Sequence, residues 1–135
     1  MFITRKADYA IRSVLYLTGK GKDLATISEI SESIQVPRLF LAKILQQLAG
    51  SGIVISERGL KGGFRLAKDP VDITLLEVIE MIQGISASNQ CAVDEDSCKL
   101  SSKCAVHPVW VKIRKMIENE LKSKNFRELA DNIEA

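Results

Sequence analysis

The chain has 135 residues, a hydrophobic fraction of 46%, only 5% aromatic residues and a formal net charge of +2, as expected for one globular domain with an aliphatic core. No apolar run approaches the ~20 residues that a membrane-spanning helix needs, and the N-terminus, MFITRKADYAIR, is charged where a signal peptide is apolar. We therefore expect a cytoplasmic protein that does not contact a membrane, whose three cysteines stay reduced rather than form disulfides.

Charge is divided unevenly along the chain. Residues 1–68 hold eleven Lys or Arg and five Asp or Glu residues, a net charge of +6, whereas residues 69–135 hold eight and twelve, a net charge of −4. A basic half on a nearly neutral chain is typical of a protein that binds a polyanion. A solvated surface without a binding partner explains the uneven charge as well. The order of the structural elements therefore has to distinguish these two interpretations.

The first 50 residues predict three helices. A helix over 4–19 follows from apolar residues at helical spacing, namely Ala7, Ile11, Val14, Leu15 and Thr18. Thr26 and Glu29 match a capping box at the start of a short second helix. Pro37 suits the first turn of a third helix, whose core-facing residues are Leu41, Ile44, Leu45 and Leu48.

A hairpin follows the third helix. Residues 53–58 and 63–67 read as strands on either side of the turn GLKGG, where Gly59, Gly62 and Gly63 permit positive φ. Three helices and a hairpin with a basic tip are the order of a winged helix-turn-helix, in which the third helix enters the major groove of DNA. The fold class is therefore predicted to be mainly α, a winged helix-turn-helix.

Candidate DNA contacts follow from this arrangement. Lys43 and Gln46 are expected to approach base edges, and Leu39 and Phe40 to touch thymine methyl groups. The hairpin is the wing of this fold, and its basic residues are placed to contact phosphates or the minor groove. The full set of candidates is Arg38, Leu39, Phe40, Ala42, Lys43 and Gln46 on the third helix, with Gln47 at the edge of its exposed face, and Arg58, Lys61 and Arg65 on the hairpin.

The second half of the chain predicts a fourth helix, capped by Thr74 with Glu77 and ending at Gly84, and a longer helix that opens at Pro108. The longer helix carries one continuous apolar stripe of Trp110, Ile113, Met116, Ile117 and Leu121. Burial of this stripe against a two-fold related copy suits a protein that reads palindromic DNA, and packing back on its own domain is the alternative. Phe126 and Leu129 predict a further short turn of helix.

The predicted divisions of the chain are a DNA-binding domain over 1–84, a cysteine-rich loop over 85–107 and a long dimerisation helix with its tail over 108–135.

All three cysteines and the single histidine lie between positions 91 and 107. A structural zinc site of three cysteines and one histidine is one interpretation, but the gaps of six and five residues between the cysteines are wider than the spacing typical of zinc knuckles. Wide gaps suit a loop around an iron–sulfur cluster. The neighbouring Asp94, Glu95 and Asp96 are then expected to point to solvent. A thiol enzyme is disfavoured because no base other than His107 and no substrate pocket are evident, so neither an enzyme nor a small-molecule substrate is expected.

Several segments together resemble the Rrf2 family of bacterial transcription regulators: KADYAIR, VPRLFLAKILQQL, RGLKGGFRLA, ITLLEVIE and Cys-x₆-Cys-x₅-Cys-x₂-His. The resemblance implies a homodimeric repressor or activator that binds double-stranded DNA at a palindromic operator. Cluster-bearing members sense cluster supply, redox state or nitric oxide. The branch of iron–sulfur cluster biogenesis regulators is most similar, and it implies a [2Fe-2S] cluster, favoured here over [4Fe-4S], held by Cys91, Cys98, Cys104 and His107.

Two departures from that branch affect these expectations. The first cysteine gap is six residues rather than five, and position 8 is Asp, as in the nitric-oxide-sensing branch, where a carboxylate from the partner's first helix completes the cluster. Asp8 is therefore the alternative fourth ligand after His107. The helix dipole also favours an acidic residue in a first helical turn, which would explain Asp8 without a cluster. The family places its selective contacts at positions matching Leu39, Ala42 and Lys43, and the wing arginine, here Arg58, in the minor groove. Ala42 replaces a carboxylate of the biogenesis regulators. A regulator of the same family that lacks a cluster and responds to a protein partner remains the alternative function.

Overall fold

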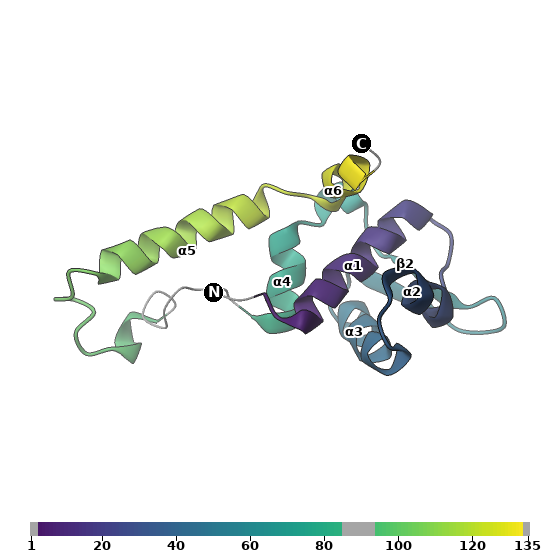
Figure 1. The fold of residues 1–135 in the computed structure, drawn as a ribbon, viewed down its shortest axis with the longest axis horizontal. Helices are drawn as coiled ribbons and strands as arrows, with labels where there is room; N and C mark the ends of the chain where they lie inside the picture. The colour runs from purple at the N-terminus through teal and green to yellow at the C-terminus, as the bar shows by residue number, and fades with distance from the viewer. Residues whose placement is uncertain (1–2, 85–93, 134–135) are drawn as a thin grey trace.

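The computed structural model describes residues 3–84 and 94–133. A compact body of helices carries a hairpin on one side, and a long helix leaves the body on the other (Figure 1). This arrangement confirms the predicted winged helix-turn-helix. The elements in chain order are α1 (Arg5–Lys20), α2 (Ile27–Ile34), α3 (Arg38–Gly50), β1 (Val54–Glu57), β2 (Gly63–Leu66), the 3₁₀ helix η1 (Pro70–Asp72), α4 (Leu75–Gln83), the 3₁₀ helix η3 (Glu95–Ser97), α5 (His107–Lys122) and α6 (Phe126–Ile133).

Threonine side chains cap three of the helices. The hydroxyl oxygens of Thr4, Thr26 and Thr74 each accept a hydrogen bond of 3.1 Å from the backbone N–H three residues further along. Each bond satisfies one of the donors that a helix start leaves without an intrahelical partner. The caps predicted at Thr26 and Thr74 are therefore confirmed. Pro37 lies one position earlier than expected, immediately before α3 rather than within its first turn.

Helix α1 is the centre of the core, because α2, α3, α4, α6 and β2 all pack against it. Its fully buried residues therefore extend around more of its circumference than one stripe. Ala10 and Leu17, which the predicted stripe omits, are completely buried, whereas Ile11 and Leu15, which it includes, are only partly buried. A helix covered on several sides does not show the single apolar face of a surface helix.

The hairpin is an antiparallel pair in which Val54 lies opposite Leu66 and Glu57 opposite Gly63. Ala25 forms an isolated antiparallel bridge with Phe64 of β2, through two backbone hydrogen bonds of 2.9 and 2.8 Å. A Cβ atom at position 63 would lie 2.7 Å from the Ala25 carbonyl oxygen, so glycine is needed there for this close approach.

The glycines of the wing serve different purposes. Gly59 has a φ of 110°, a conformation that favours glycine. Gly62 does not have a positive φ, contrary to the sequence-based expectation. Glycine is required at position 62 because a Cβ atom would collide with the backbone carbonyl oxygen of Glu57.

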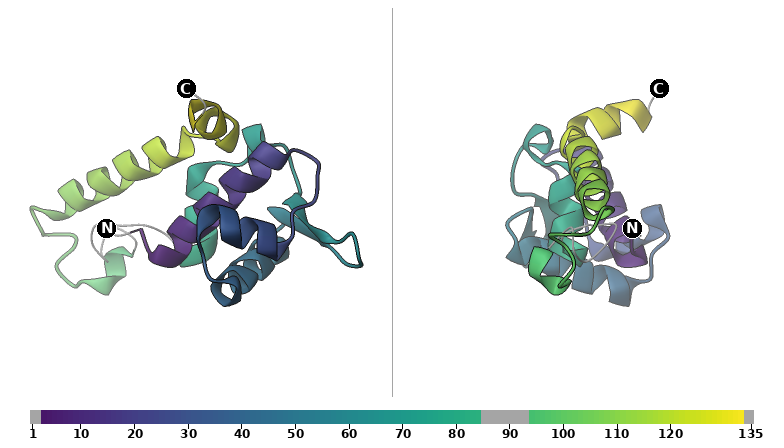
Figure 2. Two further views of the ribbon diagram at one scale, coloured as in Figure 1. Left: turned by 45° about the vertical axis from the view of Figure 1, so that its right-hand side comes forward. Right: turned by 90° about the vertical axis from the view of Figure 1, so that its left-hand side faces the viewer.

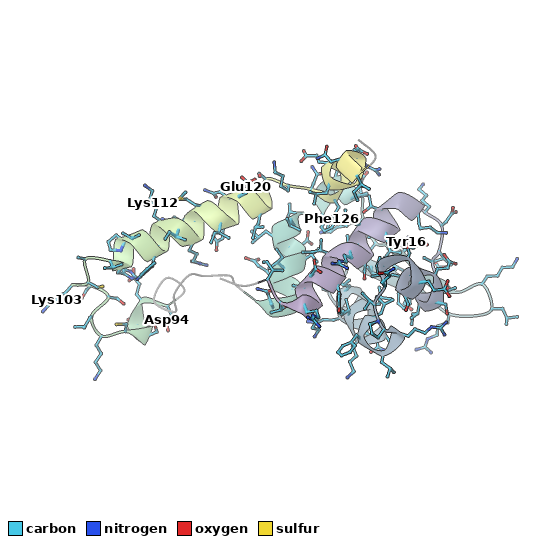
Figure 3. The ribbon with its side chains drawn as sticks, viewed as in Figure 1. Tyr16, Asp94, Lys103, Lys112, Glu120 and Phe126 are labelled. Atoms are coloured by element: carbon cyan, nitrogen blue, oxygen red, sulfur yellow. The ribbon has the colours of Figure 1, made fainter. Side chains whose placement is uncertain are left out.

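The C-terminal helix α6 returns to the winged domain. Phe126 is completely buried in the core, and Figure 3 shows it between α6 and the body of the protein. Its backbone N–H donates a hydrogen bond of 3.0 Å to the carbonyl oxygen of Ile73. The backbone N–H of Leu75 donates one of 2.9 Å to the carbonyl oxygen of Lys124. The residues after α5, which the sequence assigned to the tail of a dimerisation region, thus help to form the core of the DNA-binding domain.

Helix α5 projects from this body and packs against α4 within its own chain (Figures 1 and 2). None of the five residues of its predicted apolar stripe is buried, and Met116 is 61% exposed. Trp110, Ile113, Ile117 and Leu121 are partly buried, so the chain itself covers the stripe only in part. Among the described residues, no helix combines the length and the apolar character needed to cross a bilayer.

Candidate functional site

The outer face of α3 is exposed as the sequence predicts. Its inner face, formed by Leu41, Ile44, Leu45 and Leu48, is at most 1% exposed, so the helix is held to the domain by one side only. Leu39 is 82% and Phe40 62% exposed. Arg38, Lys43 and Gln46 are also exposed, and Ala42 is half-buried at the edge of this face.

Gln47 does not belong to this surface. Its Nε2 donates a hydrogen bond of 3.1 Å to the carbonyl oxygen of Met81 in α4. The side chain is therefore directed to the neighbouring helix, which one extra residue of helical rotation from Gln46 explains.

The hairpin presents two basic residues at its turn. Arg58 and Lys61 are exposed, and neither forms an ion pair with another described residue. Leu60 between them is fully exposed. Arg65 differs from the prediction, because its Nε lies 3.3 Å from Oε1 of Glu57 on the adjacent strand. Arg58 and Lys61 are therefore the wing cations available to an anionic partner.

A basic pocket that the sequence analysis missed lies between α1 and α3, beside the start of α3. It has a volume of about 400 Å³, and its lining includes Arg5, Lys6, Tyr9, Phe40, Lys43 and Ile44. Adjacent Arg and Lys residues in the first turn of α1 are visible in the sequence, but nothing local shows that this turn lies next to Lys43.

The cysteine-rich loop lies at the opposite end of the molecule from the wing (Figures 1 and 2). Figure 3 labels Asp94 and Lys103 on it. Within the described residues, the loop and the start of α5 enclose a pocket of about 560 Å³ whose lining includes Cys98, Cys104 and His107. This volume is many times the ~30 Å³ share of one water molecule. Cys91 lies outside the described residues.

His107 is the most informative residue of this pocket. It is the first residue of α5 and is only 8% exposed. Its Nδ1 is buried and has no hydrogen-bond partner among the described residues, while its Nε2 lies 3.7 Å from Oε1 of Glu95. The imidazole therefore does not cap the helix, and one ring nitrogen is available to a ligand while the other faces a carboxylate. A metal-binding histidine commonly donates its second ring N–H to a carboxylate, and here the carboxylate lies 3.7 Å away, just beyond hydrogen-bond distance.

The acidic residues of the loop are only partly placed as expected, because Glu95 and Asp96 line the pocket that holds the thiols. Asp94, Glu95 and Asp96 are all exposed, and the Asp94 carboxylate accepts a hydrogen bond of 3.0 Å from the backbone N–H of Asp96. Across residues 3–84 and 94–133, no three His, Cys, Asp or Glu side chains are close enough together to hold a metal ion. The described loop thus supplies two thiols and one imidazole to one pocket without forming a closed ion site.

Asp8, the alternative fourth ligand, is not brought to this pocket within the chain. Its Oδ2 lies 3.1 Å from Nη2 of Arg12, one turn further along α1. Both side chains are about half exposed. The carboxylate therefore already has a cationic neighbour on its own helix.

The fold and the exposed α3 and wing surfaces define a winged helix-turn-helix DNA-binding regulator. The model of the Rrf2 family, described as an iron-dependent transcriptional regulator, matches residues 3–132. The chain therefore belongs to the Rrf2 family. As family members are DNA-binding regulators, the expectation that the chain is not an enzyme is confirmed.

Individual relatives agree with this assignment. The chain is 31% identical over 136 residues to a protein of Aquifex aeolicus (strain VF5) whose name places it among the HTH-type transcriptional regulators. The alignment covers 99% of this chain and 94% of that protein. It is 35% identical over 108 residues to protein aau3 of Rhizobium meliloti (strain 1021), covering 79% and 70% respectively.

Solved structures show the same fold. CymR (YrzC), the global cysteine regulator of B. subtilis, superimposes with a TM-score of 0.81 at 23% identity and 98% coverage of both chains. IscR of T. potens gives a TM-score of 0.80 at 22% identity, covering 98% of this chain and 88% of that one. At this level of identity the likeness shows the fold alone.

Proposed function

We propose that this protein is a homodimeric, cytoplasmic transcription regulator whose affinity for a palindromic operator depends on an iron–sulfur cluster. The observation that carries the proposal is the buried Nδ1 of His107, which has no hydrogen-bond partner among the described residues and lies at a pocket also lined by Cys98 and Cys104. A buried polar atom without a partner is costly, and a ligand in the pocket would remove this cost.

The donor set suits an iron–sulfur cluster. Cys98 and Cys104 would hold it as thiolates, His107 through Nδ1, and Cys91 completes the set by its place in the sequence. A [2Fe-2S] cluster is favoured over [4Fe-4S] because the resemblance to the iron–sulfur cluster biogenesis regulators implies it, although four donors would fill the open iron positions of either cluster. The cluster supplies an electron-accepting centre whose loss or change of charge would report the state of the cell. The Glu95 carboxylate facing Nε2 would fix the orientation of the imidazole ring.

The incompletely covered stripe of α5 supports the dimer. Five apolar side chains on one helix face, none of them buried within the chain, favour association with a second copy, because burying such a face is worth about 25 cal/mol per Å². The two reading surfaces would then contact the two halves of an operator.

Anaerobic purification tests the cluster directly. We expect a coloured protein with visible absorption bands and equal amounts of iron and acid-labile sulfide, and operator DNA binding that changes when the cluster is removed with a chelator. A colourless protein with stoichiometric zinc would show a structural zinc site instead. A colourless, metal-free protein that still binds DNA would favour the cluster-free regulator controlled by a protein partner.

A further inference from the structure

The pocket between α1 and α3 combines an apolar floor with a cationic rim. Ile44 at its base is 1% exposed, and Phe40 beside it is 62% exposed. Arg5 and Lys6 from α1 and Lys43 from α3 line the same pocket, and no acidic residue lines it. Two elements distant in sequence thus bring three positive charges together.

Within residues 3–84 and 94–133, these three cations have no acidic partner. None of them is within ion-pairing distance of a described carboxylate, in contrast to Lys20, which pairs with Glu29, and Lys68, which pairs with Glu77. The acid nearest in sequence, Asp8, pairs instead with Arg12 at 3.1 Å. Like charges held together without neutralisation repel one another, so an anion in the pocket would stabilise the cluster.

The position of the pocket identifies the anion. Phe40 and Lys43 belong both to the pocket and to the exposed face of α3. A helix lying in the major groove has a sugar–phosphate backbone on each side of it. We propose that the pocket is a phosphate subsite in which Arg5 and Lys6 hold one DNA strand at the edge of the groove, with a deoxyribose ring against Tyr9, while Lys43 lies between this strand and the base edges.

This subsite extends the DNA interface from α3 and the wing to the first turn of α1. It rests on the DNA-binding part of the proposed function but not on the cluster. Contacts to phosphates orient a protein on the duplex and carry no base information. The subsite therefore contributes equally to operator and to unrelated DNA.

Salt dependence provides the test. The association constants of the full-length protein for a mixed-sequence DNA duplex and for its own promoter region are measured at several salt concentrations. Each phosphate contact contributes about 0.9 to the slope of log K against log salt. Lys6→Gln should therefore lower the slope by about 1 per protomer and weaken binding to both duplexes by the same factor, and Arg5→Gln should do likewise.

Lys112→Gln is the matched control, because Lys112 lies on the outer side of α5, away from α3 (Figure 3). It removes the same charge and should leave the slope unchanged. Thermal unfolding checks that the variants remain folded, which their exposed positions favour. Unchanged slopes in Lys6→Gln and Arg5→Gln, with normal operator binding by the unsubstituted protein, would overturn the subsite and leave the proposed function standing. A protein that binds neither duplex would overturn both.

Discussion

The amide of Gln47 joins α3 to the end of α4: its Nε2 donates a 3.1 Å hydrogen bond to the carbonyl oxygen of Met81. A second bond, from the backbone N–H of Thr4 to the Gln83 side chain at 2.9 Å, joins the start of α1 to the same end of α4. The cysteine-rich loop begins immediately after this point. The last turn of α4 is therefore in contact with α3 and with the residue that caps α1, and it is adjacent in sequence to the loop.

Replacing Gln47 by Ala should lower the free energy of unfolding by about 1 kcal/mol, the usual net contribution of one hydrogen bond. Urea denaturation followed by circular dichroism measures the change. Gln46→Ala is the control, since Gln46 is the same residue type at the adjacent, exposed position of α3, and it should reduce operator binding with little change in stability. Equal stability of the two variants would contradict a structural role for the Gln47–Met81 bond.

Arg58→Ala should weaken operator binding by about 1–3 kcal/mol, the range for an arginine that reads a groove. Arg58 is exposed at the wing and has no ion-pair partner among the described residues. Fluorescence anisotropy with several operators measures the loss, and Lys61→Ala provides a comparison that should reduce affinity uniformly through a phosphate contact. Affinity that stays constant for Arg58→Ala across all operators would exclude the wing from the interface.

Phe126→Ala should destabilise the protein by about 3–5 kcal/mol, because removing a buried aromatic side chain loses its transfer energy and leaves a cavity. The residue is completely buried between α6 and the winged domain, whereas Ile133 on the same helix is 69% exposed. Ile133→Ala, measured in the same denaturation experiment, should change stability by less than about 0.5 kcal/mol. Similar losses for both would mean that α6 is not anchored through Phe126.

Ile113→Asp should convert the proposed dimer to a monomer, because it places a charge in the centre of the apolar stripe of α5. Sedimentation velocity gives the molar mass directly. Lys112→Asp introduces the same residue on the neighbouring, outward side of the helix and should leave the dimer intact. A dimer that survives Ile113→Asp would require a different interface.

His107→Ala, reconstituted anaerobically, should change the visible spectrum of the cluster, whereas Asp8→Ala should not. The Nδ1 of His107 is buried without a hydrogen bond, while Asp8 already pairs with Arg12. The opposite pattern would assign Asp8 as the fourth ligand. If neither spectrum changes, water or a thiol from solution completes the cluster, and both residue assignments are wrong. Mössbauer spectra of the unsubstituted protein distinguish [2Fe-2S] from [4Fe-4S].

Features that depend on neighbours along the chain could be predicted from the sequence. The caps at Thr26 and Thr74 join residues three positions apart, and the buried face of α3 follows from its apolar residues at helical spacing. The grouping of the thiols and the imidazole in one loop is likewise visible in the sequence. Short separations cost little chain entropy to bring together, so local residue types decide these contacts.

Features that join distant segments were decided by the tertiary structure. Gln46 and Gln47 are the same residue type in adjacent positions, yet only Gln47 bonds to α4, with a partner 34 positions away. Gly62 is needed because a backbone oxygen of Glu57 lies where a side chain would start, and not because of its φ. Phe126 entered the core, and Arg5 and Lys6 came to lie beside Lys43, only through the packing of helices around α1. The sequence alone determined which groups were present; which of them meet depended on how α1, α3, α4 and α6 pack into one close-packed core.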